Sequence, residues 1–211
     1  MDPEYEALIH SDRVSANTRS VLLARMELAD EPAVGTGLSS DAKRTLQKLA
    51  ECVAPMTGRS IDFASRINTR LAAGEGKGWR YSELPPDLEA YRGAIATIDR
   101  YSLGKFNSSF LDLPPGEQMR ALTLIQCGEL EGGGPGPGDD SPILDAAQMQ
   151  RWFEDLRGDV AGLYMSHPAT LAQLGYSGIA DGANSAALSG FVELGLDKVE
   201  PWEPQARGTS E

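Results

Sequence analysis

The stretch MQRWFEDLRGDVAGLY, residues 149–164, decides the fold class. Its apolar side chains recur every three or four residues over about four helical turns, at Met149, Phe153, Leu156, Val160, Leu163 and Tyr164. This spacing follows the 3.6-residue period of an α-helix and predicts an amphipathic helix with one buried face. Trp152 lies beside that face. Glu154, Asp155 and Asp159 fall on the polar side, where we expect them to face solvent.

Other segments of the chain carry the same helical signals. Apolar spacing, capping residues and helix-opening prolines predict helices over 42–53, from about 60 to 73, from 86 onward and from 115 onward. A partial apolar stripe predicts a shorter helical stretch within residues 1–30. Gly104 is expected to interrupt the helix that begins at 86, and no regular element is expected past Pro168.

These segments together predict an all-α fold, because no run of residues favours a strand. We expect an irregular bundle of about five or six helices, with long loops and an extended C-terminal tail. The predicted organisation is an N-terminal helical arm and linker over 1–38, a helical domain over 39–195 and a tail over 196–211. Residues 131–142, EGGGPGPGDDSP, are expected to form a flexible surface loop, because they bury too little apolar area to offset the entropy of ordering.

The chain is strongly acidic, with 31 Asp and Glu against 19 Lys and Arg and a formal net charge of −12. Nucleic acid and anionic membrane surfaces are disfavoured as partners, because both attract positive charge. No stretch approaches the roughly 18 apolar residues of a membrane-spanning helix, and no secretory signal is recognisable at the N-terminus. We therefore expect a cytoplasmic protein without direct membrane insertion, which reaches the periplasm only if a partner carries it there.

A metal centre is not expected from the cysteines and histidines. Cys52 and Cys127 fall in two different predicted helices and form no CxxC pair, while His10 and His167 lie far from both in sequence. A structural zinc site needs about four such ligands close together. Each cysteine is expected to act as a small hydrophobe, and a disulfide, within the chain or to a partner, stays open.

The sequence also lacks the usual catalytic motifs. It has neither a GxSxG nucleophile elbow nor a GxxxxGK[ST] phosphate-binding loop. A stand-alone helical enzyme that uses His167, Tyr164 and Glu154 remains an alternative hypothesis. Trp202 lies between two prolines of the tail, and a tryptophan in such a position is expected to dock either on its own domain or on a partner.

Two segments resemble the small (gamma) subunits of gluconate 2-dehydrogenase-type enzymes, the gluconate 2-dehydrogenase subunit 3 family. In 149–178 the matching pieces are Trp152-Phe153, Leu156-Arg157, Gly162-Leu163-Tyr164, His167-Pro168 and Gly175-Tyr176-Ser177-Gly178. In 91–118 they are Tyr91-Arg92, Ile98-Asp99, Phe106, Phe110 and the run from Leu113 to Gln118. The order and spacing of these pieces, over about 40 to 180, carry the resemblance.

The resemblance implies a non-catalytic subunit with no cofactor of its own. Such a subunit packs on a large GMC-type flavoprotein that holds FAD and oxidises a sugar, sugar acid or glycoside, and some of these complexes include a cytochrome c. The tail motif at 200–204 is similar to versions associated with glycoside 3-dehydrogenases. The expected partner interface comprises Trp152, Tyr164, His167, Pro168, Tyr176 and Trp202. A general interaction protein with an unrelated partner is the other alternative.

Overall fold

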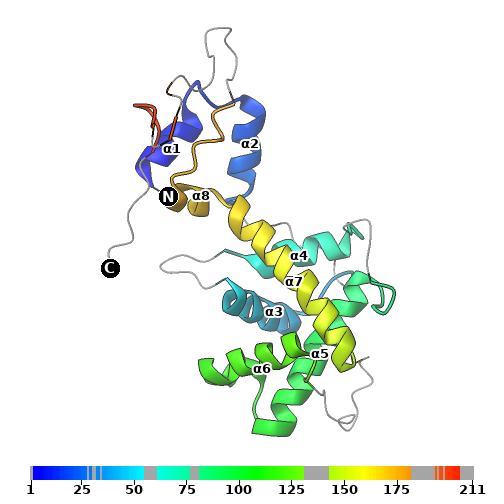
Figure 1. Ribbon diagram of the computed structural model, residues 1–211. Helices are drawn as coiled ribbons and strands as arrows, with labels where there is room; N and C mark the ends of the chain where they lie inside the picture. Colours follow the sequence, from blue (N-terminus) through cyan, green and yellow to red (C-terminus); the bar gives the residue numbers. More distant parts are fainter. Residues whose placement is uncertain are drawn as a thin grey trace. The chain divides into compact units, whose positions relative to one another are not determined.

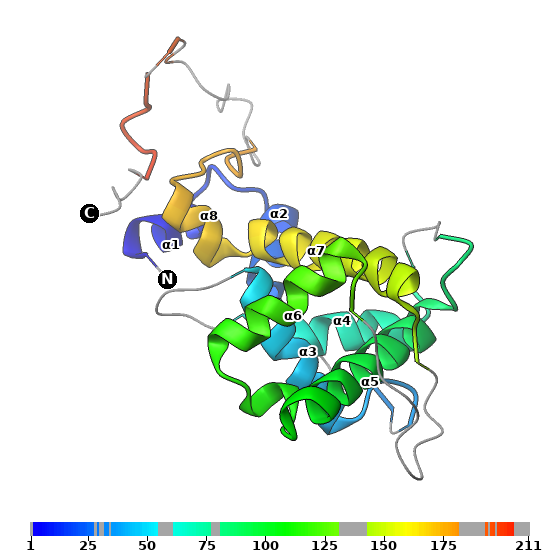
Figure 2. The same ribbon diagram turned by 60° about the horizontal axis from the view of Figure 1, so that its bottom comes forward.

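The computed structural model describes residues 2–27, 29, 32–33, 35–54, 61–76, 81–130, 143–181, 193, 195–196 and 198–204. These residues form eight α-helices and one 3-10 helix, with no strand among them (Figures 1 and 2). The predicted all-α class is confirmed, but the predicted five or six helices are too few. The short helices α1 (Pro3–His10) and α8 (Pro168–Leu174) account for the difference.

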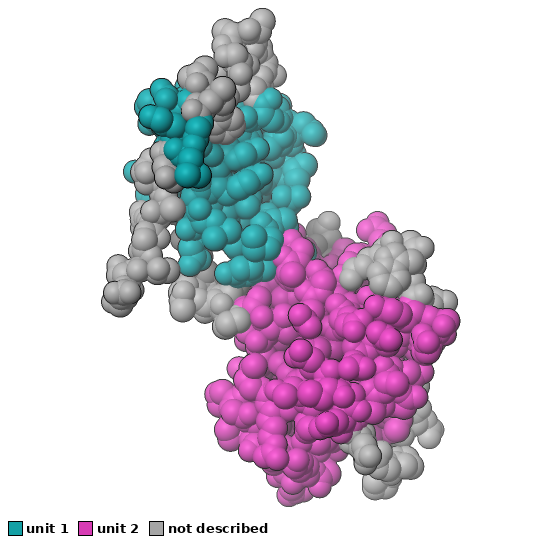
Figure 3. Space-filling view, viewed as in Figure 1, with its two compact units in different colours: residues 1–28, 163–211 teal, residues 29–162 magenta. Residues whose placement is uncertain are grey.

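The chain divides into two compact units, which Figure 3 distinguishes by colour. Unit 1 comprises residues 1–28 and 163–211, and unit 2 comprises residues 29–162. The helix α7 (Ala146–Ser166) contributes residues up to Gly162 to unit 2 and its last residues to unit 1. The predicted organisation with boundaries at 38 and 195 stays a prediction.

Unit 2 is built from α3 (Ser40–Val53), α4 (Phe63–Ala72), α5 (Asp87–Phe106), the 3-10 helix η1 (Phe110–Asp112), α6 (Pro115–Cys127) and most of α7. The helix α3 packs against α4, α5 and η1, and α4 also packs against α5. Each helix turns its apolar stripe inward, and the fully buried side chains include Leu46, Leu49, Phe63, Ile67, Ile98, Phe110, Ile125, Met149 and Trp152. The predicted stripe of 149–164 contributes Met149, Phe153, Leu156 and Val160 to this core.

The helix ends of unit 2 follow local side-chain chemistry. The N-cap side chains of Ser39 and Asp62 accept hydrogen bonds from backbone N–H groups at 3.2 and 3.0 Å, and prolines precede α5 and α6. The prediction that Gly104 interrupts the helix beginning at 86 is wrong, since α5 continues through it to Phe106. Its C-cap, Asn107, adopts a left-handed conformation with φ 51°. An isolated glycine weakens a helix by only about 1 kcal/mol, which tertiary packing outweighs here.

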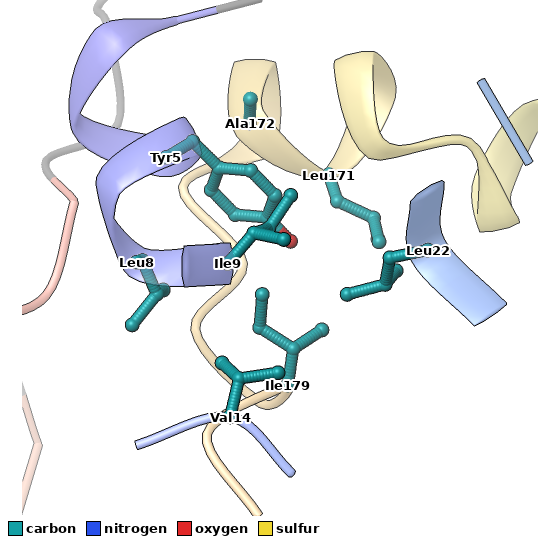
Figure 4. Close-up of a cluster of buried hydrophobic side chains, with 8 residues drawn as sticks. All are labelled: Tyr5, Leu8, Ile9, Val14, Leu22, Leu171, Ala172 and Ile179. Atoms are coloured by element: carbon teal, nitrogen blue, oxygen red, sulfur yellow. The ribbon is translucent and has the colours of Figure 1, made fainter. Parts of the chain in front are cut away.

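Unit 1 gathers α1, α2 (Ala16–Ala24), α8 and the segment after α8 around a small apolar core of its own (Figure 4). The core consists of Tyr5, Leu8, Ile9, Val14, Leu22, Leu171, Ala172 and Ile179. Residues near both ends of the sequence therefore meet in one cluster. The buried face of α8 is covered by side chains of α1 and α2, which explains why a helix of seven residues is stable in this position.

The loop predicted over 131–142 lies outside the described residues, as does the end of the tail from 205. The described part of the tail forms a turn at 201–203, with the backbone N–H of Glu203 donating to the carbonyl of Glu200 at 3.0 Å. Among the described residues, no helix combines the length and the apolar character that crossing a bilayer requires.

Candidate functional site

Trp152 lies in the core of unit 2 and is fully buried. Its indole ring meets the ring of Tyr91 edge to face, with 5.6 Å between centroids and an interplanar angle of 82°. A direct contact between Trp152 and another chain would require the indole to leave this core. The observed role of Trp152 is thus to join α7 to α5, and its place in a partner interface stays a prediction.

Next to Trp152, an ionic cluster ties three helices of unit 2 together. Arg70 of α4 donates two hydrogen bonds to the carboxylate of Asp159 on α7, one of them at 2.9 Å, and the hydroxyl of Tyr91 on α5 donates to the same carboxylate at 2.6 Å. Burial raises the pKa of Tyr91 well above its ordinary value, and the nearby negative charge of Asp159 adds to this effect. The expectation that Asp159 faces solvent is wrong, because its side chain is only 3 % exposed and its charge is neutralised by Arg70.

The acid proposed for a stand-alone enzyme, Glu154, has a structural role in unit 2. The hydroxyl of Tyr81 donates to its carboxylate at 2.7 Å, and the guanidinium of Arg151 lies 4.8 Å from the centre of the Tyr81 ring. The hydrogen bond to Glu154 raises the pKa of Tyr81, which keeps the phenol protonated as a donor. Through these contacts, Tyr81 attaches the loop that precedes α5 to helix α7.

The two other members of that hypothetical enzyme site, Tyr164 and His167, belong to unit 1. His167 is the N-cap of α8: its Nδ1 accepts the backbone N–H of Ala169 at 3.1 Å, while Pro168 occupies the first helical position. Tyr164 is half-buried in the last turn of α7, and its carbonyl accepts from the backbone N–H of His167 at 3.3 Å. His167 and Pro168 thus start α8, and the Gly-Tyr-Ser-Gly turn follows at the end of this helix.

The Gly-Tyr-Ser-Gly turn ends α8 and presents Tyr176 at the surface. Gly175 has a left-handed backbone, with φ 64°, and backbone N–H groups of Gly175 and Tyr176 return to the carbonyls of Ala172 and Leu171 at 3.2 and 2.9 Å. The phenol ring of Tyr176 folds over Gly178, where a Cβ would collide with it. Both glycines are therefore needed to hold the tyrosine in this orientation.

Tyr176 lines a groove of about 860 Å³ on unit 1. Its walls are α2 on one side and α8 with the Gly-Tyr-Ser-Gly turn on the other, and the last residues of α7 also line it. The floor includes Leu22, Leu171 and Ile179 of the unit 1 core. Several of its lining residues are large apolar side chains that remain exposed, namely Val21, Met165, Leu174 and Tyr176.

Asp181 also lines the groove and fixes the start of α2. Its carboxylate accepts hydrogen bonds from the backbone N–H of Ser15 at 2.7 Å, and from the hydroxyls of Ser15 and Thr18 at 2.6 Å each. These hydrogen bonds lower the pKa of Asp181. At the other end of α2, the Arg25 guanidinium donates to the carbonyl of Ser166 at 3.2 Å. The two ends of α2 within the groove lining therefore carry opposite charges.

Trp202 docks on its own unit. Its ring packs against the unit 1 core, and the guanidinium of Arg13 lies 4.4 Å from the ring centre. Glu203 accepts a hydrogen bond from the hydroxyl of Ser177, which joins the tail to the turn after α8. The half-buried Trp202 thus keeps one face against the unit 1 core, and any contact with a partner would involve the rest of its surface.

The cysteines are both free thiols, Cys52 half-buried in α3 and Cys127 exposed at the end of α6. Burial raises the pKa of Cys52, which disfavours a reactive thiolate. No group of three or more His, Cys, Asp or Glu side chains suited to a metal ion occurs within the described part of the chain.

Comparison with protein families matches residues 40–182 to the family described as gluconate 2-dehydrogenase subunit 3. The chain belongs to this family. The match spans helices α3 to α8 and the turn that carries Tyr176, whereas α1, α2 and the segment around Trp202 lie outside it. Neither the curated proteins nor the solved structures contain a match to the chain.

Membership of the subunit 3 family indicates that the chain is a subunit of a dehydrogenase complex. Of the residues expected in a partner interface, Tyr176 alone lines the groove. The sequence did not predict that Met165, Leu174 and Asp181 lie near Val21, because residues 163–181 and 15–25 come together only through the fold. The glycine after Leu174 was the available signal, since a proline-started, glycine-ended segment is typical of a short helix.

Proposed function

We propose that the chain is the non-catalytic small subunit of an FAD-dependent dehydrogenase. The large subunit in this proposal is a GMC-type flavoprotein that binds FAD and oxidises a sugar, sugar acid or glycoside, with C3 as one position of oxidation. A cytochrome c is a further component in complexes that pass electrons onward. The complex acts in the cytoplasm, or in the periplasm if the two subunits are exported together.

The observation that supports this proposal best is the family match over residues 40–182. The polar residues considered for catalysis also have structural tasks. His167 caps α8, and Glu154 accepts from Tyr81. Groups committed in this way serve to hold a surface in shape, which is the task of a subunit that binds another protein.

Co-expression tests the proposal directly. The chain, carrying an affinity tag, is produced together with a GMC-type flavoprotein of its own organism and is purified through the tag. We expect flavin absorbance and dye-linked sugar dehydrogenase activity to co-elute with the tagged chain, and the flavoprotein expressed alone to be less soluble or less active. A tagged chain that elutes free of flavin, beside a fully active flavoprotein, would contradict the proposal.

The same preparation separates the proposal from a stand-alone enzyme. A variant with His167→Ala, Tyr164→Phe and Glu154→Gln is added to the flavoprotein. Turnover per bound flavin should be unchanged, because the chemistry occurs on the large subunit. Loss of turnover with intact binding would favour a catalytic role for these side chains.

A further inference from the structure

We propose that the groove between α2 and α8 receives an amphipathic helix of the large subunit, with the N-terminal end of that helix next to Asp181. The inference rests on the proposed function and names the surface through which it operates. In the following, "the α2–α8 groove" means the groove lined by Val21, Met165, Leu174 and Tyr176.

The concentration of exposed apolar side chains is the first argument. Isolated exposed hydrophobics are ordinary on a protein surface, but those of the α2–α8 groove share one concave site. The half-exposed Met165 and Leu174 come from the ends of α7 and α8, and Val21 comes from α2. Covering this surface removes apolar area from water, which stabilises a bound partner.

The dimensions of the groove favour a helix as its occupant. The helix α2 has 9 residues and is therefore about 13 Å long, so a parallel segment of two to three turns fits along it. Four half-exposed side chains offer on the order of a few hundred Å² of surface, whereas a stable interface buries roughly 800 Å² on each partner. The groove thus accommodates one element of a larger interface, and an amphipathic helix in an apolar groove is a common arrangement.

Charge argues for a different protein over a second copy of the chain. Two copies would each bring a net charge of −12, and their mutual repulsion opposes association. Within the groove, Asp181 lies at the N-terminal end of α2, and Arg25 follows its C-terminal end. The N-terminus of a helix is partially positive and its C-terminus partially negative, so a helix that begins near Asp181 and ends near Arg25 has complementary charge at both ends.

Two matched pairs of variants test the groove. Met165→Asp and Leu174→Asp alter it, whereas Met119→Asp and Leu103→Asp alter equally exposed side chains of unit 2. The exposed fractions are 51 % for Met165 and 49 % for Met119, and 53 % for Leu174 and 54 % for Leu103. Far-UV circular dichroism and thermal unfolding of the free chain verify that each variant folds.

The measurement is the dissociation constant of each purified variant from that purified GMC-type flavoprotein. We expect both groove variants to bind at least about tenfold more weakly, and both unit 2 variants to stay within about twofold of the unchanged chain. Equal affinity of groove and unit 2 variants would overturn the inference while leaving the proposed function intact. If the unchanged chain itself does not bind the flavoprotein, the proposed function fails and the inference falls with it.

A photoreactive amino acid at position 174, with position 103 as the control, identifies the occupant. The cross-linked peptide of the large subunit should show apolar residues at i, i+3, i+4 and i+7, the pattern of one helix face. Cross-linking of position 174 to a second copy of the chain, or to a partner segment without this pattern, would overturn the inference.

Discussion

Replacing Asp159 with asparagine should strongly destabilise unit 2. The substitution keeps the shape of the side chain but removes the charge that receives two hydrogen bonds from Arg70 and one from Tyr91. Removing one partner of a buried ion pair costs roughly 3–5 kcal/mol, because the other charge is left buried. The Arg70 side chain is 32 % exposed and regains part of its hydration, so we expect a loss of about 2–3 kcal/mol.

Urea unfolding followed by tryptophan fluorescence measures this loss. The fluorescence of Trp152 reports on unit 2, because the indole packs against Tyr91, which itself binds Asp159. The control is Asp41→Asn, which breaks an ion pair with Arg44 whose side chains are 85 % and 69 % exposed. Such an exposed pair contributes less than about 1 kcal/mol, so the control should unfold nearly as the unchanged chain does.

A double-mutant cycle refines the result. If the pair carries the effect, Arg70→Met in the Asp159→Asn background should cost much less than Arg70→Met alone. An Asp159→Asn variant whose unfolding free energy equals that of the Asp41→Asn control would refute the reasoning, because it would mean that the carboxylate is not held in a buried cluster.

Three other outcomes are expected. Burial raises the pKa of Tyr5, so the folded state retains its proton while the unfolded state loses it above about pH 10. Unit 1 should lose stability as the pH rises beyond that value, and Tyr5→Phe should reduce this loss in alkaline thermal unfolding. The pKa of Asp181 is lowered, so its contribution is present above the ordinary value of 3.8 and is lost as the pH falls below it; Asp181→Asn should flatten the acid limb of the stability curve. A Cβ meets open space at both Gly104 and Gly74. In urea unfolding, Gly104→Ala should stabilise the protein by about 0.5–1 kcal/mol, because Gly104 is helical. Gly74→Ala should destabilise it by about 1 kcal/mol, because Gly74 has a left-handed backbone with φ 70°.

The helices of unit 2 were predictable because their signals are local. Apolar spacing, the caps Ser39 and Asp62, and the helix-opening prolines all lie within the segment that they shape. The helix α8 was not recognised, since seven residues hold too few turns to show a period. Its stability comes from side chains of α1 and α2, more than 140 residues away in sequence, which no local pattern reveals.

The burial of Asp159 also depends on residues far away in sequence, which no local pattern reveals. Its position on the polar side of the helical pattern favoured solvent exposure, and it differs from Glu154 and Asp155 only in what the rest of the fold places beside it. Arg70 lies 89 residues earlier in the chain, and Tyr91 lies 68 residues earlier. A buried carboxylate is recognised by its partners, so the sequence around Asp159 could not predict its burial.

The family match covers only part of the α2–α8 groove. The family match includes α8 and the Tyr176 turn, but the opposite wall, Val21 and the rest of α2, lies outside residues 40–182. Residues of α1, which also lies outside the match, cover the buried face of α8, where Tyr5 and Ile9 are fully enclosed. The matched segment therefore holds one wall of the groove, and the N-terminal arm supplies the other wall and part of the core beneath it. A partner that binds in the groove contacts both the matched segment and the N-terminal arm. Its selectivity therefore depends on residues that the family pattern does not describe.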